Sequence, residues 1–228
     1  MRAMSPVRHA LNVYTWSLTK GGNSLSGGYR DKYLIGLTGN IAVGKSLVRQ
    51  CLVDLGAAAI DADRVAHQVL LRGGPAFDEV VQAFGAGVIG ADGEINRAAL
   101  GKIVFADQAA LRALEAITHP PIRGRIHLLI RSAEQRVVVI EAIKLLEGNL
   151  RGVVDAVWVV NAAPETQLQR LMSERGLSEH IARQRMASQN KQEDKLRQAD
   201  VIIENDGDAA ETRAQVRRHW RDIEWRGI

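Results

Sequence analysis

The sequence predicts an α/β fold with a five-stranded parallel sheet, and three observations support this prediction. Short apolar runs alternate with helical segments along most of the chain, as expected where each parallel strand is followed by a crossover helix. The first run, 34–37, leads through a glycine-bounded loop into a helix. A later run, RVVVI at 136–140, is continuously apolar, as a strand covered on both faces should be.

The loop GNIAVGKS at 39–46 matches the pattern G-x-x-x-x-G-K-[ST], and the next residues, 47–55, are expected to be helical. Glycines in such a loop let backbone N–H groups surround phosphate oxygens, and the helix N-terminus adds positive charge. The pattern assigns Lys45 to the β- and γ-phosphates and the Ser46 hydroxyl to Mg²⁺. We therefore expect a nucleoside triphosphate site made by Gly39, Asn40, Ile41, Ala42, Val43, Gly44, Lys45, Ser46 and Leu47.

A second strand is expected at 57–61, and two carboxylates, Asp61 and Asp63, stand at its end. Ligands of parallel sheets bind at this carboxyl edge, so Asp63 is a candidate general base or acceptor-orienting residue. The alternative interpretation is structural, because either aspartate could cap the helix expected over 64–71.

Helices are expected over 76–84 and across most of 96–134. Pro120 and Pro121 are expected to interrupt the second of these helices after His119. A histidine beside proline is usually structural, and Arg123 follows it one turn later.

The remaining strands are expected at 136–140, 153–160 and 199–203, and the remaining helices at 162–174, 178–191 and 208–225. Glu141 ends the third strand, and two interpretations of it are open. It is either an acid that helps to organise Mg²⁺ or a buried, hydrogen-bonded carboxylate.

Long helical insertions follow the second and fourth strands, as in a small-molecule kinase with an acceptor-binding arm and a lid. Arg170 lies in the second insertion, with Arg175, Arg183 and Arg185 further along. A charge run is commonly a solvated face. An arginine on a closing lid can instead bind the transferred phosphate, while closure excludes water, and we favour this role for Arg170.

The composition, with 46% hydrophobic and 25% charged residues, is typical of a globular protein. No apolar run reaches the roughly 18 residues of a membrane span, so we expect no membrane partner. The only cysteine, Cys51, cannot form an internal disulfide, which favours a cytoplasmic location and a core role.

The net charge of +4 lies in residues 1–32, because the rest of the chain is formally neutral. The neutral remainder argues against a nucleic-acid partner. We expect residues 1–32 to be a flexible extension or the result of an overlong gene start. Their composition also loosely resembles that of a transit peptide. Residues 33–228 are expected to form the kinase domain.

From about residue 33 onward, the chain resembles the dephospho-coenzyme A kinase family. The motifs that carry the resemblance are GLTGNIAVGKS (36–46), DADRVAH (61–67), the FG…DG…NR…L run (84–100), VFAD (104–107), LEAITHPPIR (114–123), ETQLQRLMSERGLS (165–178) and ADVIIEND (199–206).

The resemblance implies a P-loop kinase that transfers the γ-phosphate of ATP, with Mg²⁺, to the ribose 3′-hydroxyl of dephospho-CoA. By position, Asp63 matches the family's proposed base and Arg170 its lid arginine. The acceptor-side positions are Asp61, His119 and Arg123, and the adenine is expected near Asn205. The acceptor-binding insertion is then about 64–132 and the lid about 164–197.

Two stretches depart from the family pattern. Residues 141–147 read EAIKLLE, where the family usually has Asp-Ile-Pro-Leu-Leu-Phe-Glu, so Lys144 is unusual. Lys191 stands where proline commonly follows Gln189. The alternatives are a P-loop kinase for another nucleotide or small metabolite, and a nucleotide-dependent regulatory or nucleic-acid-binding NTPase. We expect a monomer or a weak homo-oligomer.

Overall fold

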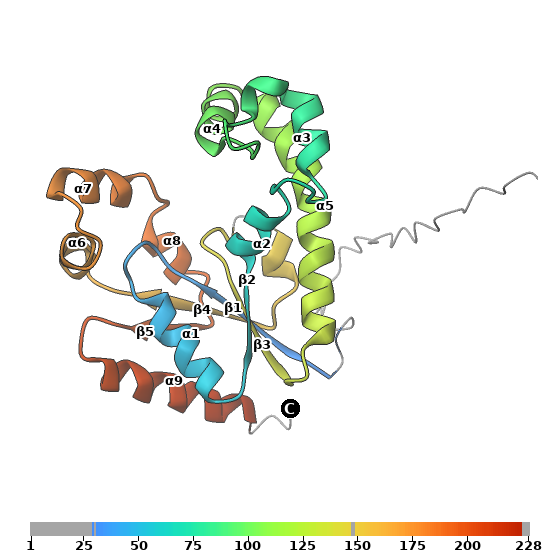
Figure 1. Ribbon diagram of the computed structural model, residues 1–228. Helices are drawn as coiled ribbons and strands as arrows, with labels where there is room; N and C mark the ends of the chain where they lie inside the picture. Colours follow the sequence, from blue (N-terminus) through green and yellow to red (C-terminus); the bar gives the residue numbers. More distant parts are fainter. Residues whose placement is uncertain (1–28, 30, 147–148, 225–228) are drawn as a thin grey trace, which may run out of the picture.

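The computed structural model describes residues 29, 31–146 and 149–224, so the predictions for residues 1–28 and for Glu147 lie outside the described residues. Five parallel strands form one sheet in the order β2-β3-β1-β4-β5 (Figure 1). The predicted fold class is confirmed. The strands are β1 (Tyr33–Thr38), β2 (Ala58–Asp61), β3 (Val137–Glu141), β4 (Ala156–Asn161) and β5 (Val201–Glu204).

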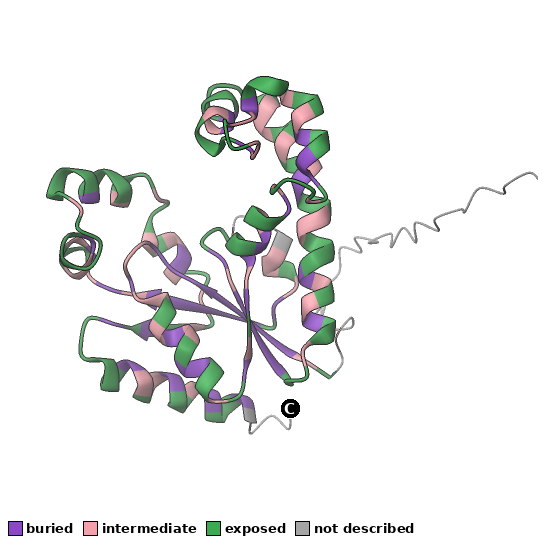
Figure 2. Cartoon of the chain, viewed as in Figure 1, coloured by how far each residue is buried: buried purple, intermediate pink, exposed green. Residues whose placement is uncertain are grey.

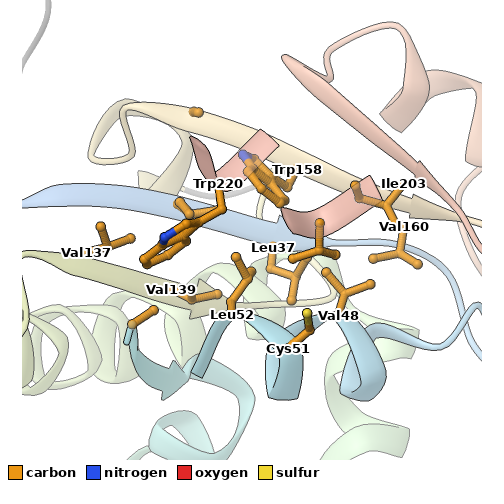
Figure 3. Close-up of a cluster of buried hydrophobic side chains, with 14 of the residues drawn as sticks. Leu37, Val48, Cys51, Leu52, Val137, Val139, Trp158, Val160, Ile203 and Trp220 are labelled. Carbon is orange, nitrogen blue, oxygen red and sulfur yellow. The ribbon is translucent and has the colours of Figure 1, made fainter. Parts of the chain in front are cut away.

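The sheet is buried because its central strands are apolar along their whole length. All six residues of β1 are buried, as are the first four of β3 and the first five of β4. On one face, α1 (Lys45–Asp54) and α9 (Ala209–Glu224) cover the sheet. Figure 3 shows Val48 and Leu52 of α1 packed with Trp158 and Trp220. Cys51 lies in the same cluster, which confirms its predicted core role.

The second strand leads into a helical arm that extends beyond the sheet at the upper right of Figure 1. The arm has its own apolar cluster, which includes Phe77, Val80, Leu100 and Val104, and Figure 2 shows that the surface around this cluster is largely exposed. Its elements are α2 (Ala62–Gln68), α3 (Phe77–Phe84), η2 (Ala86–Val88), α4 (Arg97–Ala106) and α5 (Gln108–Ser132).

The expected interruption at the two prolines is wrong, because α5 is one helix of 25 residues that contains Pro120 and Pro121. Proline has a φ that suits a helix, and its cost comes from the missing N–H and the crowded carbonyl one turn earlier. Packing on both sides offsets that cost. Ile117 packs in the cluster of the arm, whereas Ile126 is buried against the sheet.

The fourth strand leads into α6 (Pro164–Ser173), α7 (Glu179–Ala187) and α8 (Gln192–Leu196). The helix predicted over 178–191 ends earlier, at Ala187, because residues 188–191 connect α7 to α8 and contact the loop after β1. The short helix α8 was not predicted. A short 3-10 helix, η3 (Asn149–Gly152), precedes β4, which begins later than predicted. Among the described residues, no helix is both long and apolar enough to cross a membrane.

Candidate active site

Two glycines allow the loop between β1 and α1 to pass close to neighbouring groups. Gly44 has a φ of 90°, and a Cβ there would lie 2.0 Å from Nδ2 of Asn205. Gly39 has a φ of 151°, and a Cβ there would lie 2.5 Å from the Val160 carbonyl oxygen. The loop therefore requires glycine at both positions, and the predicted strand–loop–helix setting is confirmed.

Asn205, the residue after β5, and Arg170 of α6 hold the second half of the loop. The Asn205 amide nitrogen donates to the Val43 carbonyl at 2.8 Å, while the Thr212 hydroxyl donates to Oδ1 of Asn205 at 2.7 Å. The Arg170 guanidinium donates to the carbonyls of Ala42 and Asn205 at 3.2 and 2.7 Å. Arg170 thus lies against the loop, and the buried Asn205 side chain supports the loop from below.

Two glutamines hold the first half of the loop. The Ile41 N–H donates to Oε1 of Gln189 at 2.7 Å, and the Asn40 N–H donates to Oε1 of Gln192 at 3.1 Å. The N–H groups of Val43, Gly44 and Lys45 make no hydrogen bond to another described residue. These three donors, at the N-terminus of a ten-residue helix, are available to phosphate oxygens.

The Lys45 side chain folds back across the loop, where its Nζ donates to the carbonyls of Gly39 and Asn40 at 2.9 and 3.0 Å. Burial lowers the pKa of the Lys45 ammonium from 10.5, and the nearby carboxylates of Glu141 and Asp63 oppose that shift. Lys45 therefore lies within electrostatic range of both acids, in a place where its charge is poorly solvated.

The carboxylates at the ends of β2 and β3 lie together. Asp61 and Glu141 are paired in the parallel register. Asp61 is the N-cap of α2, because its Oδ1 accepts the Arg64 N–H at 2.9 Å. Asp63 lies in the first turn of that helix, and its Oδ2 accepts the Ile143 N–H at 3.2 Å.

The environment of Asp63 raises its pKa above 3.8. Burial is the largest cause, and the charge of Asp61 adds to it. The Ile143 hydrogen bond and the charge of Lys45 act in the opposite direction. Asp63 is thus a solvent-accessible acid whose pKa is raised by its surroundings and lowered in part by the charge of the phosphate-loop lysine.

Glu141 forms an ion pair with Arg49, at 3.2 Å between Oε2 and Nε. The Nε atom is buried and makes no hydrogen bond among the described residues, so the contact is an ion pair without hydrogen-bond geometry. Burial raises the pKa of Glu141, against the charges of Arg49 and Lys45. Glu141 is thus a partly buried carboxylate that is paired with an arginine at the sheet edge.

The acceptor-side residues predicted on the arm do not lie with the carboxylates at the sheet edge. His119 and Arg123 are exposed on α5, and their spacing of four residues puts them on one face of the helix. Neither side chain makes a hydrogen bond or an ion pair with another described residue. The structure thus brings Lys45, Asp61, Asp63 and Glu141 together at the sheet edge and leaves these two residues on the arm.

Sequence reasoning missed three contributors to the site: Arg49, Gln192 and Lys195. Lys195 has 4% exposure, and its Nζ donates to the Ile143 carbonyl at 3.0 Å. In the sequence it stands in QEDKL, which is typical of a solvated helix. Only the three-dimensional contacts identify it, because charged residues in such a stretch usually face water.

Comparison with known proteins places this chain beside one group of enzymes. A family model described as dephospho-CoA kinase matches residues 33–211. The dephospho-CoA kinase of Moorella thermoacetica is 45% identical over 196 residues, which cover 84% of this chain and 92% of that protein. The enzyme of the same name from Symbiobacterium thermophilum is 46% identical over 191 residues, covering 82% and 80%.

The chain is also similar in structure to solved proteins. TT1252 from Thermus thermophilus is 30% identical with a TM-score of 0.75, covering 84% of this chain and 97% of that one. A dephospho-CoA kinase from Campylobacter jejuni is 29% identical with a TM-score of 0.62, covering 86% and 100%.

Proposed function

The chain belongs to the dephospho-CoA kinase family, and on this premise we propose that it transfers the γ-phosphate of ATP to the ribose 3′-hydroxyl of dephospho-CoA, giving CoA and ADP. One observation carries the assignment of roles. Asp63, on the helix after β2, and Thr38, the residue before the phosphate loop, both hydrogen-bond to the backbone of Ile143 at 3.2 Å, so the acid lies beside the loop that carries Lys45. A proton acceptor and a phosphate-binding cation are thereby combined at one sheet edge, as phosphoryl transfer to a hydroxyl requires.

The loop supplies the ATP side of the reaction. The free N–H groups of Val43, Gly44 and Lys45 are the proposed donors to phosphate oxygens. The Lys45 ammonium, now on loop carbonyls, exchanges those bonds for the β- and γ-phosphates. Preorganised donors of this kind stabilise charge that develops on the transferring group. Asn205 keeps the loop in shape and is proposed to lie near the adenine.

Asp63 is the proposed general base. The acceptor oxygen bonds to the γ-phosphorus as the bond from that phosphorus to the β,γ-bridging oxygen breaks, and ADP leaves. The hydroxyl proton passes to Asp63. A general base is most effective when its pKa approaches the working pH, and the pKa of Asp63 is raised in that direction.

The residues at the sheet edge suit a magnesium ion that is shared with the nucleotide. Mg²⁺ is commonly bound through one or two protein oxygens, with water and substrate phosphates completing its shell. The Ser46 hydroxyl would hold it, and Glu141 would act through water because its carboxylate is paired with Arg49. No group of three or more His, Cys, Asp or Glu residues in the described part of the chain forms a metal cluster. When bound, the ion neutralises phosphate charge.

The arm and the lid complete the proposal. We assign residues 64–132 to acceptor binding, with contacts from Asp61, His119 and Arg123. We assign residues 164–197 to the lid, from which Arg170 would move its guanidinium from loop carbonyls to the transferred phosphate. The enzyme is proposed to act in the cytoplasm, as a monomer or a weak homo-oligomer, without nucleic-acid or membrane partners.

The test is an assay of the purified chain with Mg·ATP and a panel of acceptors: dephospho-CoA, nucleoside monophosphates, shikimate and gluconate. We expect CoA from dephospho-CoA alone. Asp63→Asn should retain ATP affinity and lose about a hundredfold or more in kcat. Asp222→Asn, an exposed aspartate on α9, is the matched control. Turnover of another acceptor in place of dephospho-CoA, or unchanged kcat in Asp63→Asn, would contradict the proposal.

A further inference from the structure

The buried Lys195 side chain is unusual in its position. It comes from α8, which directly follows the segment that contacts the phosphate loop. A buried ammonium is costly unless polar groups compensate it, and one of its partners is the Ile143 carbonyl oxygen at 3.0 Å. The Thr38 hydroxyl donates to the same oxygen at 3.2 Å. Two donors from the nucleotide half of the site therefore meet on Ile143.

Ile143 links these donors to the carboxylate of Asp63, because its own N–H donates to Oδ2 at 3.2 Å. Both backbone polar groups of this one residue are thus engaged in the site. Ile143 lies in the turn after β3, outside the sheet ladder. Ile143 is 39% exposed, whereas Ala142 before it is buried and Lys144 after it is exposed. Packing therefore restrains Ile143 little, and hydrogen bonds to its backbone have more to contribute.

The same short helix also touches the ATP side. Gln192 accepts the Asn40 N–H and donates to the Val160 carbonyl at 2.9 Å. One segment of the chain thus contacts the loop proposed to bind ATP and, through Ile143, the acid proposed to activate the acceptor.

We propose that Lys195 is a positioning residue for phosphoryl transfer, which acts with Thr38 through the Ile143 backbone to hold Asp63 in place. The inference rests on the proposed function, and it adds a residue that does not itself touch the reacting atoms. Because the contact is indirect, its loss should misplace the base without removing it. Misplacement of a reacting group by about 1 Å can cost up to a hundredfold in rate.

The first measurement is steady-state kinetics of Lys195→Met. We expect kcat to fall about tenfold, with KM for ATP within about twofold of wild type. Thr38→Val removes the other donor without changing charge, and kcat should fall about threefold by the same route. Arg218→Met is the matched control, since this exposed cation lies on α9, outside the arm and the lid, and its kcat should be unchanged.

The decisive measurement is made in the Asp63→Asn background. If Lys195 acts through Asp63, adding Lys195→Met should reduce the residual kcat by less than about twofold, because the two effects are not additive. A full tenfold further loss would overturn the proposal, and so would a rise in KM for ATP with unchanged kcat. If Lys195→Met does not fold, as judged by circular dichroism, Thr38→Val in the same background decides by the same criterion. Failure of wild type to phosphorylate dephospho-CoA would instead contradict the proposed function.

Discussion

The two sides of the site differ in how much of their geometry exists before any ligand is bound. On the nucleotide side, Asn205, Arg170, Gln189 and Gln192 each hold backbone groups of the loop at hydrogen-bond distance. On the acceptor side, the residues proposed on α5 are exposed and make no hydrogen bonds to described residues. The difference suggests a formed surface for ATP, whereas the acceptor itself would have to order the side chains of α5 that we propose to bind it.

The substitution Lys45→Ala should have the largest effect on the nucleotide side. The ammonium supplies positive charge where phosphate binds, and removing one such preorganised donor costs about a hundredfold or more in kcat. We expect KM for ATP to rise as well, because the charge also acts in the ground state. Steady-state kinetics with ATP as the varied substrate measure both effects. A loss confined to KM for dephospho-CoA would place Lys45 on the wrong side of the site.

The pH dependence of activity tests Asp63, which lies between the nucleotide side and the acceptor side. Burial raises the pKa of Asp63 above 3.8 and the charge of Asp61 adds to this, whereas the Ile143 hydrogen bond and the charges of Lys45 and Lys144 lower it. The base works only when deprotonated. Activity should therefore fall about tenfold per pH unit below the raised pKa, with the acid limb at higher pH than for an ordinary aspartate.

The pH profile of kcat/KM measures that limb. In Asp63→Asn the limb should disappear from the residual activity. A limb that stays at the ordinary aspartate value in wild type, or that persists in Asp63→Asn, would assign the titration to another group.

Asn205→Ala should weaken the nucleotide side without abolishing it. The change removes the donor to the buried Val43 carbonyl, whereas the Thr212 hydroxyl keeps the Asp208 carbonyl, at 3.3 Å, as an acceptor. Leaving a buried polar group unsatisfied costs about 1 to 3 kcal/mol in the free energy of unfolding. Denaturant unfolding should show this loss, and KM for ATP should rise about tenfold. KM for dephospho-CoA should stay near wild type, and a change in that constant alone would contradict the comparison.

Arg123→Ala should have the converse effect. Because the side chain is exposed, its removal should change the free energy of unfolding by no more than about 0.5 kcal/mol. KM for dephospho-CoA should rise by up to about fivefold, because a solvent-exposed charge contact contributes up to about 1 kcal/mol. His119→Ala, one turn away, is the companion variant. A loss of stability with no change in that KM would show a structural role.

Removal of residues 1–28 should have the smallest effect. The cut leaves in place Tyr29, whose ring lies against His127, and Lys32, whose ammonium donates to carbonyls after α5. We expect kcat/KM within about twofold of wild type, a difference below 0.5 kcal/mol in transition-state stabilisation. A loss greater than about tenfold would reopen the regulatory alternative.

The parts of the fold that were predictable are those that local pattern determines. Apolar runs located all five strands, and glycine spacing located the loop, because each of these patterns is contained within a few consecutive residues. The helix through Pro120 and Pro121 was not predictable, since its support comes from two clusters distant in sequence. The role of Lys195 was not predictable for the same reason. Its partner is 52 residues away, and nothing in its local sequence distinguishes it from a solvated lysine.

The unbroken course of α5 has a mechanical consequence. At about 1.5 Å per residue the helix is roughly 37 Å long, and it is anchored to the sheet at one end and to the cluster of the arm at the other. Such a rod acts as a lever. A tilt of about 5° at the anchored end would carry the far end by about 3 Å, while His119 and Arg123 near its middle would travel about half as far. The whole arm would thus move as one body toward or away from a bound acceptor, with little bending within α5.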